Sequence, residues 1–577
     1  MGLTSSLQIG NSALNAAQLA IQVAGNNMAN AATPGYSRQV AFMEASAPDN
    51  MGGIQIGMGV RVSGIRRQVD EALQARLWSS VSHQASSQQQ STILSQLEST
   101  MGELGTNDLS SQLSKFFNTW SERANLTQSS AVVIQQGQQL ADFVRKLRSD
   151  INDQKAQIDN QIGVQVERAD GVLTKIAELN YQISSTETGG GGQAGSLRDQ
   201  RDQLITELSQ YMDVSAVEQE NGSVNILVGS TPVVLGSRNR GIQVARESHG
   251  GTTTLSVALK DNNENLDIRS GQIGASIADR SASIDSTIAT IDHLTSQVIF
   301  EINKLHSTGI NTDWLTTASS NLAIPTTDRT LSLNNPANGT LAGLPFQAVN
   351  GGFTVNIKSS SGATQAIRIN VDLDGLDNTG AAGFDDDSTP QSIASAINAI
   401  DGVSASIGTD GKLKITADAG FSFAFSDDSS TALAVLGVNS YFTGSDATNI
   451  NIRADLKTTP SNLMVGRLQD GAFVENATAL KISALQTAQI TALGGQSISK
   501  SWLDTAQALG VKADAAKNAA DAAATVTQGL DAQRSAISGV SVDEESVNLL
   551  TFQRQYQGAA RFISVVDQMT QTLISLI

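Results

Sequence analysis

The sequence predicts an α+β multidomain protein: terminal coiled-coil-like helices, a long antiparallel helical rod domain and inserted small β domains. Three observations lead to this prediction. The chain has 577 residues, more than one hydrophobic core supports. Its two ends carry apolar residues at helical spacing, and strand-like runs divided by Gly, Asn and Asp turns lie in its middle. Aromatic residues make up only 4% of the chain, which suits long helices and thin β domains.

The composition excludes several classes of function. The net charge of −18 argues against nucleic acid, because binding phosphates needs clustered Lys and Arg. The absence of cysteine excludes disulfides, thiolate metal sites and cysteine nucleophiles. The first twenty residues contain no Lys or Arg, so no standard secretory signal is predicted. No apolar run approaches the roughly 18 residues of a membrane span, so no membrane partner is predicted either.

The N-terminal segment predicts a helix with an apolar seam whose residues alternate four and three apart. The large residues of this seam are Leu3, Leu7, Leu14, Ile21 and Met28, and the small ones are Gly10, Ala17 and Ala24. Since small residues let another helix approach closely, we interpret the seam as a docking face. Ser5 and Gln8 predict a capping box at the helix start, and Pro34 predicts the helix end.

The C-terminal segment repeats the pattern with larger side chains. Its predicted seam includes Leu549, Phe552, Tyr556, Ile563, Val566, Leu573 and Ile577. Ser541 and Glu544 predict a second capping box. Burying such apolar side chains is worth roughly 1.5–3 kcal/mol each, so leaving them exposed promotes association. We therefore expect the two ends to pair with each other and with neighbouring subunits, which makes both seams assembly interfaces.

Two motifs resemble the signatures of one family, the flagellar rod, hook and hook-associated proteins. The first is NNMANAATPGYSRQ, residues 26–39, whose signature residues are Asn26, Asn27, Asn30, Thr33, Pro34, Gly35 and Tyr36. The second, residues 539–577, resembles the matching C-terminal signature. Three further runs resemble the hook-associated members in particular: SLRDQRDQLITELS (196–209), EINKLHSTG (301–309) and NSYFTGSDATNI (439–450).

The resemblance implies a structural subunit of the bacterial flagellum that forms the junction between hook and filament through coiled-coil assembly of its terminal helices. It implies self-assembly into a ring or tube, with hook protein and hook-associated protein 3 as partners. It also implies a flagellar export chaperone that covers the C-terminal seam, and secretion through the flagellar export channel to the extracellular flagellum. Two alternatives stay open: a rod or hook subunit of the same family, and a secreted binding module that uses its β insert.

The pattern between the ends predicts a nested arrangement of four domains. These are a paired terminal-helix domain (1–45 and 538–577), a helical rod domain (46–211, 269–320 and 471–537), a small β domain (212–268) and a β-rich insert with a flagellin-like motif (321–470). Within the rod we predict a helix over about 271–306 and a loop at residues 189–192. Arg198 and Asp202, four apart on a helix, predict a solvated ion pair.

The residue inventory predicts no enzyme, no cofactor and no metal. The four histidines contain no pair three to five residues apart, and no HExxH is present. We expect His306 to satisfy a helix end or a core contact. Asp372, Asp374 and Asp377 resemble part of a calcium loop, but Leu376 stands where a third ligand belongs. We interpret this acidic run as a solvated loop.

Overall fold

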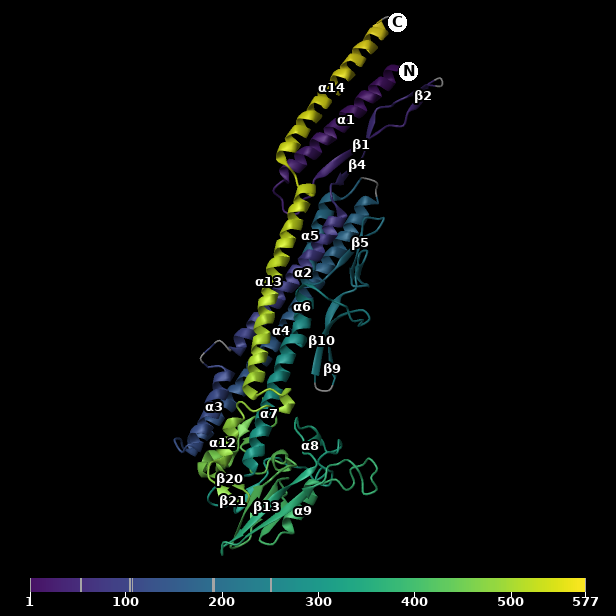
Figure 1. Cartoon of the computed structure of the whole chain (residues 1–577). Helices are drawn as coiled ribbons and strands as arrows, with labels where there is room; N and C mark the ends of the chain where they lie inside the picture. The colour runs from purple at the N-terminus through teal and green to yellow at the C-terminus, as the bar shows by residue number, and fades with distance from the viewer. Residues whose placement is uncertain are drawn as a thin grey trace. The chain divides into compact units, whose positions relative to one another are not determined.

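The computed structural model describes residues 2–51, 54–102, 105, 107–188, 192–249 and 252–575 (Figure 1). Long helices dominate and the strands form small antiparallel sheets, so the predicted α+β class is confirmed. The chain divides into two compact units, residues 1–94, 156–281 and 513–577 for the first and 95–155 and 282–512 for the second. This division is coarser than the four predicted domains, whose boundaries remain a prediction.

The first unit is built on long helices that run antiparallel. Its helices are α1 (Gly2–Ala29), α5 (Gly195–Tyr211), α6 (Gly271–Asp279) and α14 (Val542–Ser575), with parts of α2 (Glu71–Met101), α4 (Ser130–Glu187) and α13 (Ile498–Ser538). Leu73 and Leu77 of α2 form a core cluster with Leu530 of α13. Further along α2, the Ser80 hydroxyl lies 2.8 Å from the hydroxyl of Thr527, which fixes the antiparallel direction.

The strands of the first unit form two hairpins, a small pair and one sheet. β1 (Gln39–Ala45) pairs with β4 (Val60–Arg67), and β2 (Asp49–Met51) with β3 (Ile54–Ile56). The sheet has the order β5 (Ser215–Glu218), β6 (Val224–Val228), β7 (Thr231–Leu235) and β8 (Arg238–Asn239), and β9 (Ile242–His249) pairs with β10 (Thr252–Leu259). Alternate residues of β6 are buried, as a strand with one covered face requires.

The second unit combines helices with the predicted insert. Its helices are α3 (Leu109–Ala124), α7 (Ser286–Ser307), α8 (Gly339–Ala342), α9 (Pro390–Asn398), α10 (Ala432–Val435), α11 (Ala454–Thr458) and α12 (Ala477–Ala484), with short 3₁₀ turns at Pro460–Asn462 and Thr491–Leu493. Its strands are β11 (Gly309–Ile310), β12 (Thr317–Ser319), β13 (Gly351–Ser359), β14 (Thr364–Val371), β15 (Val403–Ile407), β16 (Leu413–Ala417), β17 (Phe421–Ser426), β18 (Phe442–Thr443), β19 (Asn451–Ile452), β20 (Gly466–Gln469) and β21 (Ala472–Val474). The strand orders are β14-β13-β17, β12-β16-β15, β11-β20-β21 and β18-β19.

The insert folds around aromatic residues of its own strands. Phe353 of β13 and Phe423 and Phe425 of β17 are fully buried, and the Phe353 and Phe425 rings meet edge to face with centroids 6.2 Å apart. These rings serve the core, so they offer no stacking surface to a glycan. The insert also contains the short helix α9, and a reciprocal capping box between Thr389 and Ser392 fixes its start.

One local prediction made for α1 is wrong. α1 begins at Gly2, so Ser5 and Gln8 lie inside the helix and do not cap it. The predicted helix over 271–306 is confirmed: α6 continues into α7 (Ser286–Ser307) through a π-helical segment at Arg280–Asp285, where the Arg280 guanidinium pairs with the carboxylate of Asp159. The predicted loop at residues 189–192 falls outside the described residues apart from Gly192. Among the described residues, no helix has the length and apolarity that a membrane span needs.

Candidate functional site at the paired chain ends

α1 packs through its small residues. Its buried residues are Gly10, Ala16, Ala17, Ala20, Val23, Ala24 and Asn27, a set that contains the whole predicted small set of the seam. The predicted large residues are only half-buried: Leu3, Leu7, Leu14, Ile21 and Met28. The closest packing of α1 therefore follows its small residues, and its large side chains keep surface that a further chain could cover.

α14 lies beside α1 and runs in the opposite direction, with both chain ends at the same end of the pair (Figure 1). Of its predicted seam residues, Val566 is buried and Leu549, Phe552 and Ile563 are half-buried. Tyr556 and Leu573 are exposed, and Ile577 lies outside the described residues. At the start of the helix, the Ser541 hydroxyl accepts a hydrogen bond of 3.4 Å from the Glu544 backbone amide, which is one half of the predicted capping box.

A groove of about 440 Å³ opens where α1, α14 and the β1–β4 hairpin meet. Its lining is mostly apolar and includes Gly10, Ala13 and Ala17 of α1, Met43 and Val60 of the hairpin, and Ala559 and Phe562 of α14. At Gly10 the two helices approach so closely that a β-carbon there would lie 2.6 Å from Cγ1 of Ile563. The glycine therefore permits the contact between the helices.

The N-terminal signature folds into a turn held by Asn27, which is 1% exposed. The Asn27 side-chain amide donates to the Gln39 carbonyl oxygen at 2.8 Å, and its oxygen accepts from the Gln39 amide at 3.0 Å and from the Tyr36 hydroxyl at 2.9 Å. Asn26 donates to the same hydroxyl at 3.3 Å. The turn is therefore organised around one buried amide side chain.

The remaining signature residues shape the same turn. Asn30 donates to the Asn26 carbonyl oxygen at 2.9 Å, and Thr33 donates to the Asn30 side chain at 3.3 Å. The carbonyl oxygen of Pro34 accepts a 2.5 Å hydrogen bond from Gln203 of α5. Gly35 has φ +75°, and a β-carbon there would collide with the Gln203 side chain, so this position requires glycine.

Glu545 of α14 completes the turn from the other end of the chain. Its carboxylate accepts from Nε of Arg38 at 2.8 Å and from Asn27 at 3.2 Å, across 507 and 518 residues of sequence. The Glu545 side chain is 3% exposed and that of Arg38 is 20% exposed. The Arg38 backbone amide also donates to the Ser538 carbonyl oxygen at 2.8 Å. We call Asn27, Tyr36, Arg38 and Glu545 the terminal cluster.

Two aspartates of α5 connect the turn and the β1–β4 hairpin to the rod. The Arg67 guanidinium lies 2.8 Å from the carboxylate of Asp199 and 2.7 Å from that of Asp202. Asp199 also accepts a 3.2 Å hydrogen bond from the Ser37 amide. The predicted solvated pair of Arg198 and Asp202 is therefore wrong. Arg198 is buried and binds Glu187 at 2.7 Å and Glu218 at 2.6 Å instead.

Burial and charge alter the protonation of two of these groups. Burial, followed by the negative charges of Asp199 and Glu545, raises the pKa of Tyr36 to about 12. Burial disfavours the charged form of Arg67, but the charges and hydrogen bonds of Asp202 and Asp199 outweigh it and raise the pKa of its guanidinium. Both shifts keep protons on the groups that hold the turn.

The runs at residues 301–309 and 439–450 meet inside the second unit. Asn303 accepts from the Tyr441 and Phe442 amides at 2.9 Å each, and its amide donates to the Phe442 carbonyl oxygen at 3.0 Å. His306 is fully buried: its Nε2 accepts from the Met464 amide at 3.1 Å, so its Nδ1 donates to the Asn439 carbonyl oxygen at 2.7 Å. The expected core contact of His306 is therefore found.

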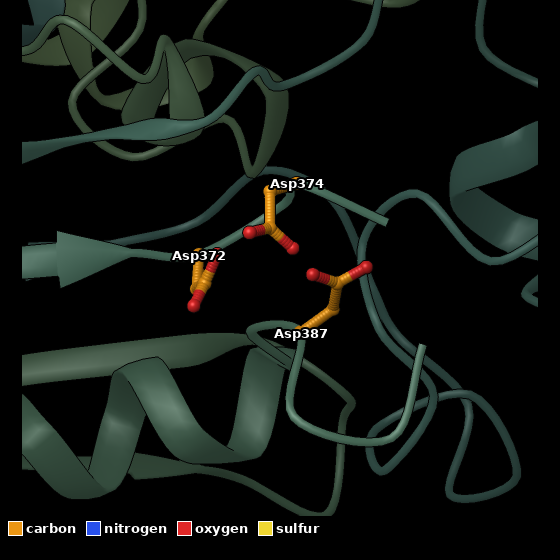
Figure 2. A group of neighbouring side chains, drawn as sticks. All are labelled: Asp372, Asp374 and Asp387. Carbon is orange, nitrogen blue, oxygen red and sulfur yellow. The ribbon is translucent and has the colours of Figure 1, made fainter. Parts of the chain in front are cut away.

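The acidic run forms a cluster that differs from the expected one. Asp372, Asp374 and Asp387 bring carboxylate oxygens within 4.8 Å of one another, and Figure 2 shows the Asp374 and Asp387 carboxylates facing each other. Asp377 instead accepts from the Thr379 and Ala381 amides, at 2.9 and 3.0 Å. Asp387 is already bonded by the Asn334 side chain at 2.7 Å. The carboxylates that lie together are therefore not the three of the calcium-loop pattern, because Asp387 takes the place of Asp377.

Sequence reasoning missed the polar half of the paired ends. Glu545, Arg67 and Asp199 were not predicted as site residues, although the signatures or motifs quoted above contain Glu545 and Asp199. From sequence alone, charged side chains are assigned to the surface, because their partners are known only once the fold is known. A usable signal was the Asp-x-x-Asp spacing of Asp199 and Asp202, which places two carboxylates on one helix face.

Three family models match parts of the chain. The model described as "Flagellar hook-associated protein FlgK helical domain" matches residues 94–319. "Flagella basal body rod protein" matches residues 7–36, and "Flagellar basal body rod FlgEFG protein C-terminal" matches residues 532–576. The two terminal matches coincide with the helices of the paired ends.

The chain is similar over almost its whole length to proteins named flagellar hook-associated protein 1. That of Escherichia coli is 25% identical over 98% of both chains, and that of Salmonella typhimurium 24% identical over 98% of both. That of Bacillus subtilis is 23% identical over 99% of this chain and 97% of the other. A solved structure of the flagellar hook junction protein FlgK from Burkholderia pseudomallei is 14% identical, with a TM-score of 0.47, and covers 80% of this chain and 100% of that one.

Proposed function

The chain belongs to the flagellar hook-associated protein 1 family, and we propose that its paired terminal helices are the element through which it joins hook to filament. It is a structural component of the bacterial flagellum, at the junction between these two parts. Proteins of this family are flagellar structural proteins, and we infer that the chain acts through its geometry and performs no catalysis. The helical domain matched at residues 94–319 favours this role over a rod or hook subunit.

One observation carries the proposal. α14 presents eight large apolar side chains between 43% and 68% exposed. One is Val542 at its first residue, and we call the other seven the outer stripe, of which Phe562 also lines the groove with α1: Val547, Leu550, Phe562, Val565, Met569, Leu573 and Ile574. Several of them recur three or four residues apart, so they share one side of the helix. Large apolar side chains exposed on one side of a helix indicate a partner.

The occupant of the outer stripe in the assembled state would be another subunit. A ring or tube needs a heterologous contact, in which one surface of each copy meets a different surface of the next. The outer stripe and the half-buried large residues of α1 provide two such surfaces. The same reasoning extends to hook protein and hook-associated protein 3 on either side of the junction.

Before assembly, the stripe would need a cover. We propose that an export chaperone binds α14 over the outer stripe, because exposed Phe, Val and Met side chains promote aggregation. We also propose that the chain leaves the cell through the flagellar export channel. The absence of cysteine suits this route, since no disulfide can form once the chain reaches an oxidising space.

The variant Ile563→Asp tests the proposal. An aspartate at this position would place a charge against Gly10 in the apolar contact between the helices, and burying it there is costly. We expect circular dichroism to show a folded chain and immunoblots of purified flagella to show no incorporation. Gln568→Asp is the matched control, because it adds the same charge to the same helix. Gln568 is exposed and belongs neither to the predicted seam of α14 nor to the outer stripe. Normal incorporation of Ile563→Asp would reject the assembly role of the paired ends.

A further inference from the structure

The terminal cluster joins segments that the sequence separates widely. Most of the turn over residues 26–39 uses local partners, with Asn26, Asn30 and Thr33 bonded to one another. One buried hydrogen bond of the turn, however, goes from the Asn27 amide to Glu545, 518 residues later. The turn therefore completes its hydrogen bonding only when α14 is in place.

Glu545 makes the shortest polar contacts of the Arg38 side chain and also accepts from Asn27. One carboxylate oxygen takes Nε and a terminal nitrogen of Arg38 at 2.8 and 2.7 Å, and the other takes the Asn27 amide at 3.2 Å. Asn27 is 1% exposed, so water cannot readily replace the lost acceptor. Without Glu545, the buried Asn27 amide would lose an acceptor, and Arg38 would keep only longer contacts, to Glu544 at 3.6 Å and Gln68 at 3.5 Å, which is unfavourable.

Burial in α1 is concentrated near this cluster. Six of the seven buried residues of α1 lie between Ala16 and Asn27, towards the turn, whereas Leu3 and Leu7 at the far end are only half-buried. The order of α1 therefore depends mainly on its C-terminal half, where the turn and α14 meet. A change at Glu545 should spread into this half first.

We propose that Glu545 is a positioning residue that couples the two chain ends: docking of α14 through Glu545 orders the turn over residues 26–39 and, through it, the C-terminal half of α1. A protein that binds α14 and removes it from α1 would thereby also prevent the α1 docking face from forming. This deepens the proposed function, on which the role of such a binding protein rests, by assigning one residue to the control of both interfaces.

Hydrogen exchange of the free full-length chain tests this coupling, with Glu545→Gln against Glu544→Gln. Glu544 is the matched control, because it lies one residue away, 3.6 Å from Arg38, with its side chain 67% exposed. We expect Glu545→Gln to speed exchange of residues 16–39 about tenfold while the second unit is unchanged, and Glu544→Gln to leave residues 16–39 as in the parent chain. Faster exchange confined to α14, faster exchange throughout the chain, or no change would each overturn the proposal.

A second variant separates coupling from a general loss of stability. Arg38→Gln alone should speed exchange of residues 16–39 to a similar degree. Adding Glu545→Gln to it should cause little further change, because both substitutions remove the same Arg38–Glu545 ion pair. Additive effects would overturn the proposal. The measurement uses the free chain, so a negative result rejects the coupling and leaves the junction role standing. Absence of the chain from the hook–filament boundary would reject the junction role whatever the exchange rates are.

Discussion

Gly10 of α1 faces Ile563 of α14. This glycine marks a close contact between the two terminal helices. A β-carbon on Gly10 would lie 2.6 Å from Cγ1 and 3.4 Å from Cδ1 of Ile563. Such a distance is shorter than a real β-carbon contact, so Ile563 would have to move to accommodate a side chain at this position. The spacing of the helices is therefore set by the absence of a side chain at Gly10.

Gly10→Ala should separate the helices. We expect it to destabilise the terminal pair by about 1–2 kcal/mol through overpacking, even though alanine favours helix formation. Gly25→Ala is the matched control, because Gly25 lies on the same helix with nothing within 4 Å of its added β-carbon. Hydrogen exchange of α1 should be faster in Gly10→Ala and slower in Gly25→Ala. Equal behaviour of the two variants would show that the close approach does not stabilise the pair.

Tyr36 should make the paired ends sensitive to alkali. Its pKa is raised to about 12 from the ordinary 10.0, so the folded chain holds the phenol proton more tightly than the unfolded chain does. The resulting stabilisation is complete below pH 10 and is lost as the pH rises through about 12. Exchange or proteolysis of residues 16–39 should therefore increase more steeply between pH 10 and 12 in the parent chain than in Tyr36→Phe. Tyr181→Phe, at an exposed tyrosine, should behave like the parent, and a parent-like profile for Tyr36→Phe would contradict the assignment.

His306 should make the second unit sensitive to acid. Burial, followed by the positive charge of Arg453, lowers the pKa of His306 to about 3, so the folded chain resists a proton that the unfolded chain accepts near pH 6.5. Its effect is absent above that pH, and stability is lost as the pH falls below it, by about 2–3 kcal/mol at pH 4.5. Denaturant unfolding at pH 7 and 4.5 should show a smaller acid-induced loss for His306→Gln than for the parent.

The control for His306 lies on the same helix. His293 is exposed, so His293→Gln should keep the acid-induced loss of the parent chain. If His306→Gln and His293→Gln lost the same stability between the two pH values, burial of His306 would not be the source of the effect.

The sequence predicted much of the apolar architecture. The small residues Gly10, Ala17 and Ala24 were read from their spacing, and all three lie in the buried face of α1. The strand-like runs of the insert likewise appear as strands, two of which pair and bury Phe353 and Phe423. These features follow from periodicity, because a buried face repeats along a helix or strand.

The polar architecture could not be predicted in the same way. Arg198 and Asp202 satisfy the spacing of a helical ion pair, yet each binds a residue of another element. Glu545 looked like a helix-start charge and is a buried partner of Arg38 and Asn27. Such partners depend on which segments the fold brings together, and a single sequence carries no periodic signal for them.

The central claim is that this chain forms the hook–filament junction through its terminal helices, and cryo-electron microscopy of that boundary in flagella assembled with this chain tests it most directly. We predict a layer of this chain found only between hook and filament, with α1 and α14 in the inner tube and the outer stripe of α14 covered by a neighbouring subunit. A chain located along the rod, hook or filament, or a junction in which the outer stripe faces solvent, would contradict the claim.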